Sequence, residues 1–160
     1  MPAGAESTQE QLLSVLQTAK NRLEYLTPND WTLIVDRAKR LTFKKTETLV
    51  RQGTQSKIVY VIATGKVNVT VSGVRLAQLG SGQICGDMSF LENTIASATA
   101  TAEEEVEAYA LEWQSLMDLF ELFPHLASRF YRSLALNLSR RLREQIMVKQ
   151  GGGPDPKHQV

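Results

Sequence analysis

Hydrophobic residues at both ends of the chain recur every three or four positions, whereas those in the middle alternate with polar residues. At the N-terminal end the recurring residues are Leu12, Leu16, Ala19, Leu23 and Leu26. This spacing predicts a helix from about residue 8 to 25, and Ser7 and Thr8 can cap its first turn. A second helix is predicted after Thr27, because threonine is a good cap and Pro28 suits the first turn. The buried stripe expected on this helix is Trp31, Ile34, Val35 and Ala38.

From Phe43 to Glu112 the hydrophobic period changes to two. Valine alternates with polar residues from Val67 to Val71, and a similar alternation returns from Val106 to Ala110. Alternation of this kind is typical of strands with one buried face. Short strands separated by glycine turns predict an antiparallel β-roll or barrel. The glycines at these turns are Gly53, Gly65, Gly73, Gly80 and Gly82.

Helical spacing returns at Trp113 and is predicted to last to Leu122, and a longer helix follows from Pro124 to about Val148. The longer helix carries an apolar residue every four positions, namely Phe130, Leu134, Leu138, Leu142 and Ile146. A row with this spacing drifts around the helix instead of forming a heptad seam. It could act as a lid over a pocket, pack on the roll, or form an interface with a second subunit or a partner domain.

Together these periods predict one α+β domain. An antiparallel β-roll of the jelly-roll type, also called a double-stranded β-helix, is expected to be flanked by N-terminal and C-terminal helices. The domain covers 8–148, with N-terminal helices at 8–41, the roll at 42–112 and C-terminal helices at 113–148. Residues 1–7 are predicted to be a disordered lead-in. The glycines after the last helix predict a flexible tail over 149–160.

The composition of the 160 residues indicates a soluble, cytoplasmic module. A formal net charge of +1 argues against a dedicated nucleic-acid binder. No apolar run approaches the roughly twenty residues of a membrane-spanning helix, so no transmembrane segment is predicted. The single cysteine, Cys85, excludes an internal disulfide framework, and the N-terminus lacks the segments of a secretory signal.

The reactive side chains of this sequence predict neither an enzyme nor a metal site. The only histidines, His125 and His158, lie outside the strand region, so the ligands of a metal-binding β-barrel are missing. The sequence has no catalytic triad, Walker loop or dinucleotide-binding glycine motif on suitable elements. Cys85 is interpreted as a small buried hydrophobe, with a redox switch as the alternative. No cofactor is predicted.

Two short segments within the predicted roll have the residue order of a phosphate-binding cassette. The first reads Gly86-Asp87-Met88-Ser89-Phe90-Leu91, and the second reads Ala96-Ser97-Ala98-Thr99-Ala100. They resemble the cassette of the cyclic nucleotide-binding domain family, which reads roughly Gly-Glu-aliphatic-Ala-aliphatic and, further on, Arg-Ala-Ala-Thr-aliphatic. The resemblance covers about residues 23–146, since 43–53 looks like the family's opening strand pair and 59–67 like its central hairpin.

The resemblance implies a role for each matching position. In the family, backbone amides at the start of a short helix hold the phosphate, the acid binds the ribose 2′-hydroxyl, and the arginine pairs with a phosphate oxygen. Asp87 takes the position of the acid and Ala96 that of the arginine, while Ser97 stands where a hydroxyl favours cGMP in some relatives. The implied ligand-binding residues are Gly86, Asp87, Met88, Ser89, Ala96, Ser97 and Thr99. The competing interpretation is a local turn and helix cap at 86–87 and small residues packed in a strand at 97 and 99.

The alanine at position 96 removes the cation that the resemblance implies. No lysine or arginine occurs between Leu76 and Ser128. A charge-assisted hydrogen bond contributes about 1.5–3 kcal/mol, so binding of cAMP or cGMP is expected to be weak, altered or lost. An arginine of the last helix would replace this cation if it folded back onto the cassette. The arginines of that helix are Arg129, Arg132, Arg140, Arg141 and Arg143.

The leading hypothesis is a regulatory module that senses cAMP or cGMP and moves its helices when the pocket is occupied. The alternative is a protein-interaction or oligomerisation module with a vestigial pocket, within a larger signalling or transport protein. A third hypothesis keeps the pocket for another small ligand, uncharged or apolar. The chain stops before the helix-turn-helix of the family's transcription factors, so no DNA-binding domain is expected, and the chain is either free-standing or a module of a longer one.

Overall fold

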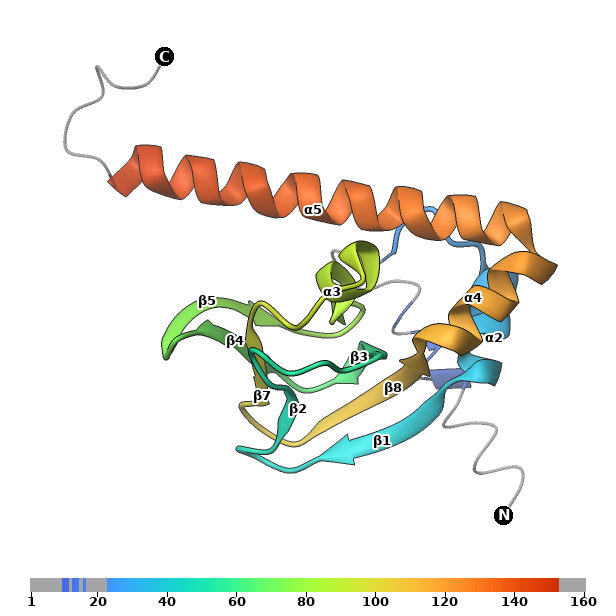
Figure 1. The fold of residues 1–160 in the computed structure, drawn as a ribbon, viewed down its shortest axis with the longest axis horizontal. Helices are drawn as coiled ribbons and strands as arrows, with labels where there is room; N and C mark the ends of the chain where they lie inside the picture. Colours follow the sequence, from blue (N-terminus) through green and yellow to red (C-terminus); the bar gives the residue numbers. More distant parts are fainter. Residues whose placement is uncertain (1–9, 12, 15, 17–22, 153–160) are drawn as a thin grey trace.

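The computed structural model places two β-sheets against each other and lays the longer helices along one side of them (Figure 1). It describes residues 10, 11, 13, 14, 16 and 23–152, with side chains up to residue 148. The helices are α2 (Pro28–Arg37), α3 (Asp87–Glu92), α4 (Trp113–Leu122) and α5 (Pro124–Gly152). The strands are β1 (Lys39–Phe43), β2 (Thr48–Val50), β3 (Ile58–Thr64), β4 (Val67–Val71), β5 (Val74–Leu79), β6 (Ile84–Cys85), β7 (Thr99–Ala102) and β8 (Val106–Glu112).

The two sheets are four-stranded, with strand orders β1-β8-β3-β6 and β2-β7-β4-β5. All of the strand pairs in these sheets are antiparallel, as in the pairing of Val61 with Tyr109 between β3 and β8. Helices precede and follow the strands in the chain. The predicted α+β class and the antiparallel β-roll are therefore confirmed.

Strands β3 and β8 are buried on both faces, which explains why most of their residues are hydrophobic. One face of each contributes to the core between the two sheets, through residues such as Ile62 and Ala108. The opposite face packs against the helices, through Val59, Val61 and Leu111. The sheet that contains them is therefore an inner layer, with the second sheet on one side and α2, α4 and α5 on the other.

Helix α2 begins where the sequence predicts, because Thr27 and Asp30 form a reciprocal capping box. The Thr27 hydroxyl accepts from the Asp30 amide at 3.1 Å, and the Asp30 carboxylate accepts from the Thr27 amide at 3.0 Å. Trp31, Ile34 and Val35 of the predicted stripe are buried, and Ala38 is the C-cap, half-buried against the same core. Helix α4 has the predicted bounds, and α5 begins at the predicted proline.

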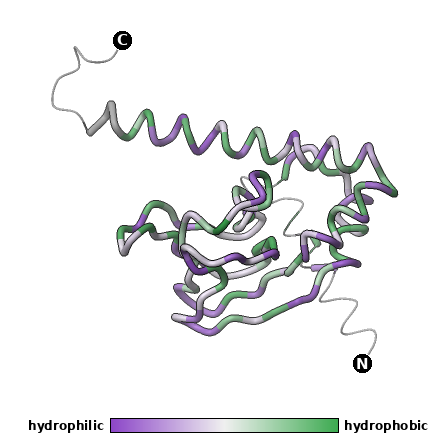
Figure 2. Tube along the Cα trace, in the orientation of Figure 1, coloured by the Kyte–Doolittle hydropathy of each residue, from purple (hydrophilic) through white to green (hydrophobic). Residues whose placement is uncertain are grey.

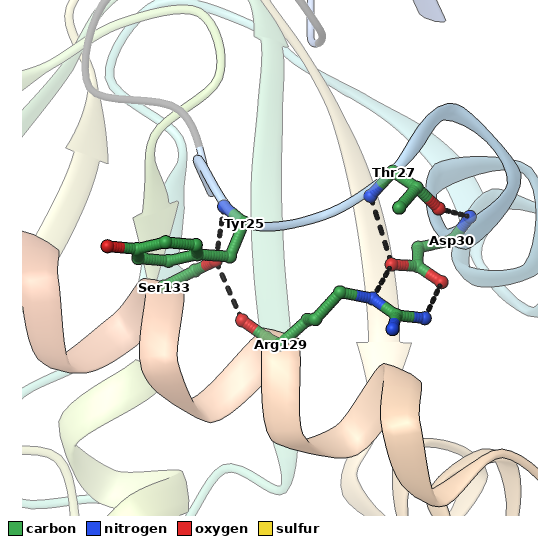
Figure 3. A network of polar contacts seen from close by, with 5 residues as sticks. All are labelled: Tyr25, Thr27, Asp30, Arg129 and Ser133. Atoms are coloured by element: carbon green, nitrogen blue, oxygen red, sulfur yellow. Dashed lines mark hydrogen bonds and ion pairs between the residues drawn. The ribbon is translucent and has the colours of Figure 1, made fainter.

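A polar network joins the segment before α2 to the first turns of α5 (Figure 3). Arg129 donates from Nε and Nη2 to the two carboxylate oxygens of Asp30, at 2.6 and 2.9 Å. The Ser133 hydroxyl accepts from the Tyr25 amide at 3.0 Å and donates to the Arg129 carbonyl at 2.8 Å. Arg132 lies over the Tyr25 ring at 4.0 Å. These contacts fix how α5 sits against α2.

Three predicted boundaries are wrong. The first helix was expected to reach residue 25, but Glu24 and Tyr25 form a turn, where the Tyr25 amide bonds to Ser133 instead of continuing a helix. The roll was expected to begin at 42, but β1 begins at Lys39, because Ala38 is extended and the next residues pair with β8. Helix α5 continues to Gly152 instead of ending near 148, so the first residues of the predicted tail are helical. The predictions for 1–7 and 153–160 lie outside the described residues.

Replacing Asp30 with asparagine is expected to lower the midpoint of thermal unfolding by roughly 4–8 °C, because it removes the charge that Arg129 binds while keeping the side-chain shape. Circular dichroism melting at pH 7 checks this. Asp36→Asn is the matched control, since Asp36 is exposed on the same helix, and its midpoint should shift by less than about 2 °C. Equal midpoints for Asp30→Asn and the parent chain would contradict a stabilising role.

The same pair predicts an acid dependence of stability. Hydrogen bonding from Arg129 lowers the pKa of the Asp30 carboxyl below its ordinary value of 3.8. A carboxyl with a lowered folded-state pKa stabilises the fold fully above its unfolded pKa, and this stabilisation is lost as the pH falls through the folded-state pKa. The difference in midpoint between the parent and Asp30→Asn should therefore be constant near neutrality and shrink below about pH 4.

Candidate functional site

A cavity of about 100 Å³ opens between the two sheets, α3 and α5. Its walls are mostly small or apolar, including Val50, Val69, Leu79 and Ile84. All of the residues that the sequence nominates for ligand binding line this one cavity: Gly86, Asp87, Met88, Ser89, Ala96, Ser97 and Thr99. The fold therefore brings the two cassette segments together, while their contact with a ligand stays a prediction.

Gly86 is the residue that lets the chain turn from β6 into α3. It caps α3 with φ of 85° in the left-handed region, where a side chain is disfavoured. A Cβ built at this position would lie 2.9 Å from the carbonyl oxygen of Ile58, so the backbone of β3 also excludes a side chain. The glycine is explained by local geometry and close packing, as well as by its place beside the cavity.

Asp87 is the acidic residue of the cavity and is almost fully buried, with 3% of its surface exposed. Its Oδ2 atom has no hydrogen-bond partner among the described residues. Burial raises the pKa of this carboxyl, while Arg141 and the backbone amides of Asp87 and Met88 act in the opposite direction. A buried carboxylate oxygen without a donor is costly, so this atom is ready to accept a hydrogen bond from a hydroxyl or an amine.

The second cassette segment is held by backbone pairing with the loop that follows β2. Ala96 donates its amide to the Thr54 carbonyl at 3.0 Å, and its carbonyl accepts from the Gly53 amide at 2.8 Å. The Thr99 hydroxyl accepts from the Gln52 amide at 2.9 Å, so it already has a structural role. Ser97 is exposed and Ala96 is 4% exposed. This wall of the cavity is thus rigid, small and uncharged.

Comparison with known proteins assigns the family. The family model described as "Cyclic nucleotide-binding domain" matches residues 40–122, which is more than half of the 160 residues. The chain belongs to the cyclic nucleotide-binding domain family. The match spans from the second residue of β1 to the end of α4, so it includes the roll except for its first residue, and both cassette segments.

The chain is similar to named members of this family. It is 30% identical over 139 residues to Cyclic GMP-binding protein C of Dictyostelium discoideum, covering 79% of this chain and 5% of the relative. It is 32% identical over 124 residues to the Cyclic AMP receptor protein of Thermus thermophilus, covering 74% and 56%. The chain thus spans a small part of the first relative and about half of the second.

Solved structures show the same architecture. The Thermus thermophilus Catabolite Activator Protein has a TM-score of 0.66 at 31% identity, covering 80% of this chain and 61% of that one. A cyclic nucleotide-binding domain from Methylobacillus flagellatus has a TM-score of 0.77, covering 94% and 87%. Its identity is 20%, so it supports the fold alone.

This cyclic nucleotide-binding domain has an arginine at its cavity that comes from outside the cassette. Arg141 of α5 lines the cavity. Its Nη1 lies 3.8 Å from Asp87 Oδ2, and its Nη2 donates to the Ile84 carbonyl at 3.3 Å. The sequence alone did not distinguish Arg141 from the other arginines of this helix. Among the others, Arg129 pairs with Asp30, Arg140 pairs with Glu24 at 3.0 Å, and Arg132 stacks on Tyr25.

The apolar row of α5 divides into a buried half and an exposed half. Phe130 and Leu134 are fully buried in the core shared with α2 and α4, and Leu138 is half-buried. Leu142 and Ile146 are 59% and 46% exposed and line a wider groove between α5 and β5. Apolar and hydrophilic segments alternate along the helix into this exposed half (Figure 2). Phe130 and Leu134, at the start of the row, pack in the core. A lid or interface role remains a prediction for Leu142 and Ile146, at its end.

Aromatic contacts connect the cassette helix to α5. The Phe90 ring of α3 is stacked on Tyr131 with centroids 6.2 Å apart, and it meets Phe130 edge-on at 6.4 Å. Phe90 also meets Trp113 of α4 at 5.8 Å. A displacement of α3 therefore acts directly on the packing of both C-terminal helices.

The other residues considered for reactive or metal-binding chemistry are Cys85 and the two histidines. Cys85 is buried, and burial raises the pKa of its thiol to about 12, as expected for a small core residue. His125 is exposed and His158 lies outside the described residues. Within the described residues there is no cluster of metal-binding side chains. In the same part of the chain no helix is long and apolar enough to cross a membrane.

Gly86→Ala is expected to destabilise the domain more than a glycine substitution in an open turn. Gly73 has a similar φ of 83° but open space around it, so Gly73→Ala should cost only the left-handed strain of about 1–2 kcal/mol. At Gly86 the contact with the Ile58 carbonyl should add at least about 1 kcal/mol. Urea unfolding of the two variants measures the difference. Equal losses in the free energy of unfolding would show that the backbone of β3 moves aside at no cost in stability.

Proposed function

We propose that this domain is a sensory module that binds cAMP or cGMP in the cassette cavity with low affinity and transmits occupancy to α5. The observation that carries the proposal is the buried Asp87 Oδ2, which lines the cavity without a hydrogen-bond donor from the described residues. The relatives named above are a cyclic GMP-binding protein and a cyclic AMP receptor protein. We propose the same ligand class for this chain, acting without catalysis.

The cavity offers each part of a cyclic nucleotide a suitable surface. Asp87 can accept the ribose hydroxyl, which would give its orphan oxygen a donor. The small residues of the second cassette segment, from Ala96 to Ala100, leave room in the cavity for the cyclic phosphate. The apolar wall of Val50, Val69 and Leu79 suits the face of a purine. At about 100 Å³ the cavity is below the roughly 300–1,000 Å³ of typical ligand pockets, so it must widen when it binds.

Low affinity follows from the uncharged residue at position 96. A cassette arginine would add a charge-assisted hydrogen bond, worth about 1.5–3 kcal/mol or roughly ten- to over a hundredfold in affinity. Ala96 is buried and the 96–100 segment has no basic residue, so a cation for the phosphate has to come from another element. The proposal is therefore a sensor for high ligand concentrations.

Transmission to the helices follows from the contacts of Phe90. Widening of the cavity moves α3, and Phe90 carries this movement to Phe130 and Tyr131 of α5. A ligand shifts such an equilibrium only through contacts that differ between the two states. The contact that differs in this proposal is the hydrogen bond from the ligand to Asp87, which forms in the widened cavity and not in the narrow one.

Introducing an arginine into the cassette is the direct test of the cavity assignment. Ala96→Arg is expected to bind cAMP or cGMP at least about tenfold more tightly than the parent, because the new guanidinium pairs with the phosphate. Calorimetric titration at fixed moderate salt measures both affinities. Thr94→Arg is the matched control, since Thr94 is exposed beside the same segment and outside the cavity, and it should bind like the parent.

The outcomes of this titration separate the hypotheses. No heat from the parent or from Ala96→Arg at millimolar nucleotide would refute cyclic nucleotide binding at this site. Binding of uncharged adenosine as tightly as cAMP by the parent would favour a pocket for uncharged ligands.

A second candidate function is self-association through the exposed half of α5. Leu142, Ile146 and Val148 are between 46% and 73% exposed, and with Leu76 of β5 they border a groove of about 580 Å³. Exposed apolar surface of this kind on one helix face suits a second copy of the same helix. In this alternative the domain is an oligomerisation module and the cavity is vestigial.

The association hypothesis predicts a mass that depends on concentration. Sedimentation velocity between micromolar and hundreds of micromolar chain should show a shift from monomer to dimer, and Leu142→Asp should abolish the shift by placing charge in the interface. Leu91→Asp is the control, because Leu91 is a similarly exposed leucine on α3. A monomer at every concentration would exclude this function.

A further inference from the structure

We infer that Arg141 supplies the cation that the cassette lacks, so that an anionic ligand binds between the roll and α5 instead of within the cassette alone. This inference rests on the proposed function and names the residue on which ligand charge is recognised. It makes α5 a part of the binding site, because Arg141 is a residue of that helix.

The charges around the cavity point to Arg141. Of the described residues that line it, Arg141 is the one with a positive charge and Asp87 the one with a negative charge. The family cassette implied by sequence also combines one acid and one arginine. The cavity therefore keeps that charge balance, although the arginine comes from a different element and Ala96 occupies the usual place.

The pairing of Arg141 with Asp87 leaves the guanidinium available. The Nη1 to Oδ2 distance of 3.8 Å is well beyond the roughly 2.7–2.9 Å of a charge-assisted hydrogen bond. The hydrogen bond to the Ile84 carbonyl is long, at 3.3 Å. Arg129 on the same helix shows the contrast, with two short bonds to Asp30 at 2.6 and 2.9 Å. A guanidinium has five donors, so Arg141 can bind a further acceptor without losing a strong partner.

The position of Arg141 also allows it to follow a ligand. Its side chain is 31% exposed, and the next residues of α5, starting with Leu142, are exposed. The helix is anchored at Arg129 and Ser133 and, one residue before Arg141, by the ion pair of Arg140 with Glu24. The guanidinium therefore lies where the anchored part of α5 ends, and a small tilt of the helix changes its distance from the cavity.

These observations define the class of ligand. Asp87 offers an acceptor for a hydroxyl, and Arg141, a few ångströms away, offers donors for an anion. A ligand that carries a phosphate and a nearby free hydroxyl satisfies both residues at once. The competing interpretation is that Arg141 only neutralises Asp87 and closes the cavity, in which case a ligand must displace it.

The two interpretations differ in the sign of one substitution, Arg141→Gln. If Arg141 binds the anion, the variant should bind cAMP or cGMP about ten- to a hundredfold more weakly than the parent. If Arg141 only closes the cavity, the variant should bind more tightly. Calorimetric titration of the full chain with cAMP, cGMP and adenosine gives this sign. Adenosine keeps the hydroxyls but lacks the phosphate, so its affinity should not fall.

Two further variants make the result specific. Arg143→Gln removes an exposed arginine of the same helix outside the cavity, and it should leave the cAMP and cGMP affinities within about twofold. Ala96→Arg combined with Arg141→Gln should regain the lost affinity, because the cation returns to the opposite wall. Thermal melting of each variant without ligand checks that it is folded.

Several results would overturn the inference. Unchanged or tighter cAMP and cGMP binding by Arg141→Gln would exclude Arg141 as the anion partner and leave the proposed function standing. Binding by Ala96→Arg without measurable binding by the parent would show that Arg141 does not replace the cassette arginine, although the cavity is a nucleotide site. No binding by either would refute the inference together with the proposed function.

Discussion

The structure depends on the burial of β3 and β8 on both faces. Their alternate side chains enter two separate cores, one between the sheets and one beneath the helices. A sheet with two apolar faces must be covered on both, so the helices at the two ends of the chain are required for the roll to persist in water. The cassette lies where these layers meet. At Gly86 the backbone of β3 leaves no room for a side chain, and Phe90 packs against the helical core.

Much of this fold can be predicted from the sequence, because its strongest signals are local. Thr27 and Pro28 specify the start of α2, and the return of helical spacing at Trp113 gives α4 its bounds. The start of β1 could not be predicted, since Lys39 to Thr42 are exposed and show no alternation. This strand forms because it pairs with β8. Pairing with a distant strand cannot be recognised from the sequence of one strand alone.

The sequence predicts which residues line the wall of the cavity, but not which residue brings a positive charge to it. Residue order within the cassette indicates which side chains line the cavity, because they are close in sequence and joined by short turns. The sequence alone could not identify Arg141 among the arginines of α5, because the arginine that reaches the cavity depends on how this helix packs against the rest of the fold. The bonds between Asp30 and Arg129 fix the position of α5, and Arg141 lies about 18 Å further along the helix axis. A contact far from the cavity therefore decides which cation reaches it.

Helix α5 is held near one end and free at the other, and this gives it the mechanics of a lever. Its buried contacts lie around Ser133, an exposed ion pair joins Arg140 to Glu24 further along, and the helix then continues to Gly152. At 1.5 Å per residue, Arg141 is about 12 Å from this pivot and the last turn about 28 Å. A rigid rod that rotates about the pivot moves its tip more than twice as far as it moves Arg141. A shift too small to alter the roll would thus be magnified at the end of the chain that the structure describes, where the apolar side chains of Met147 and Val148 face solvent.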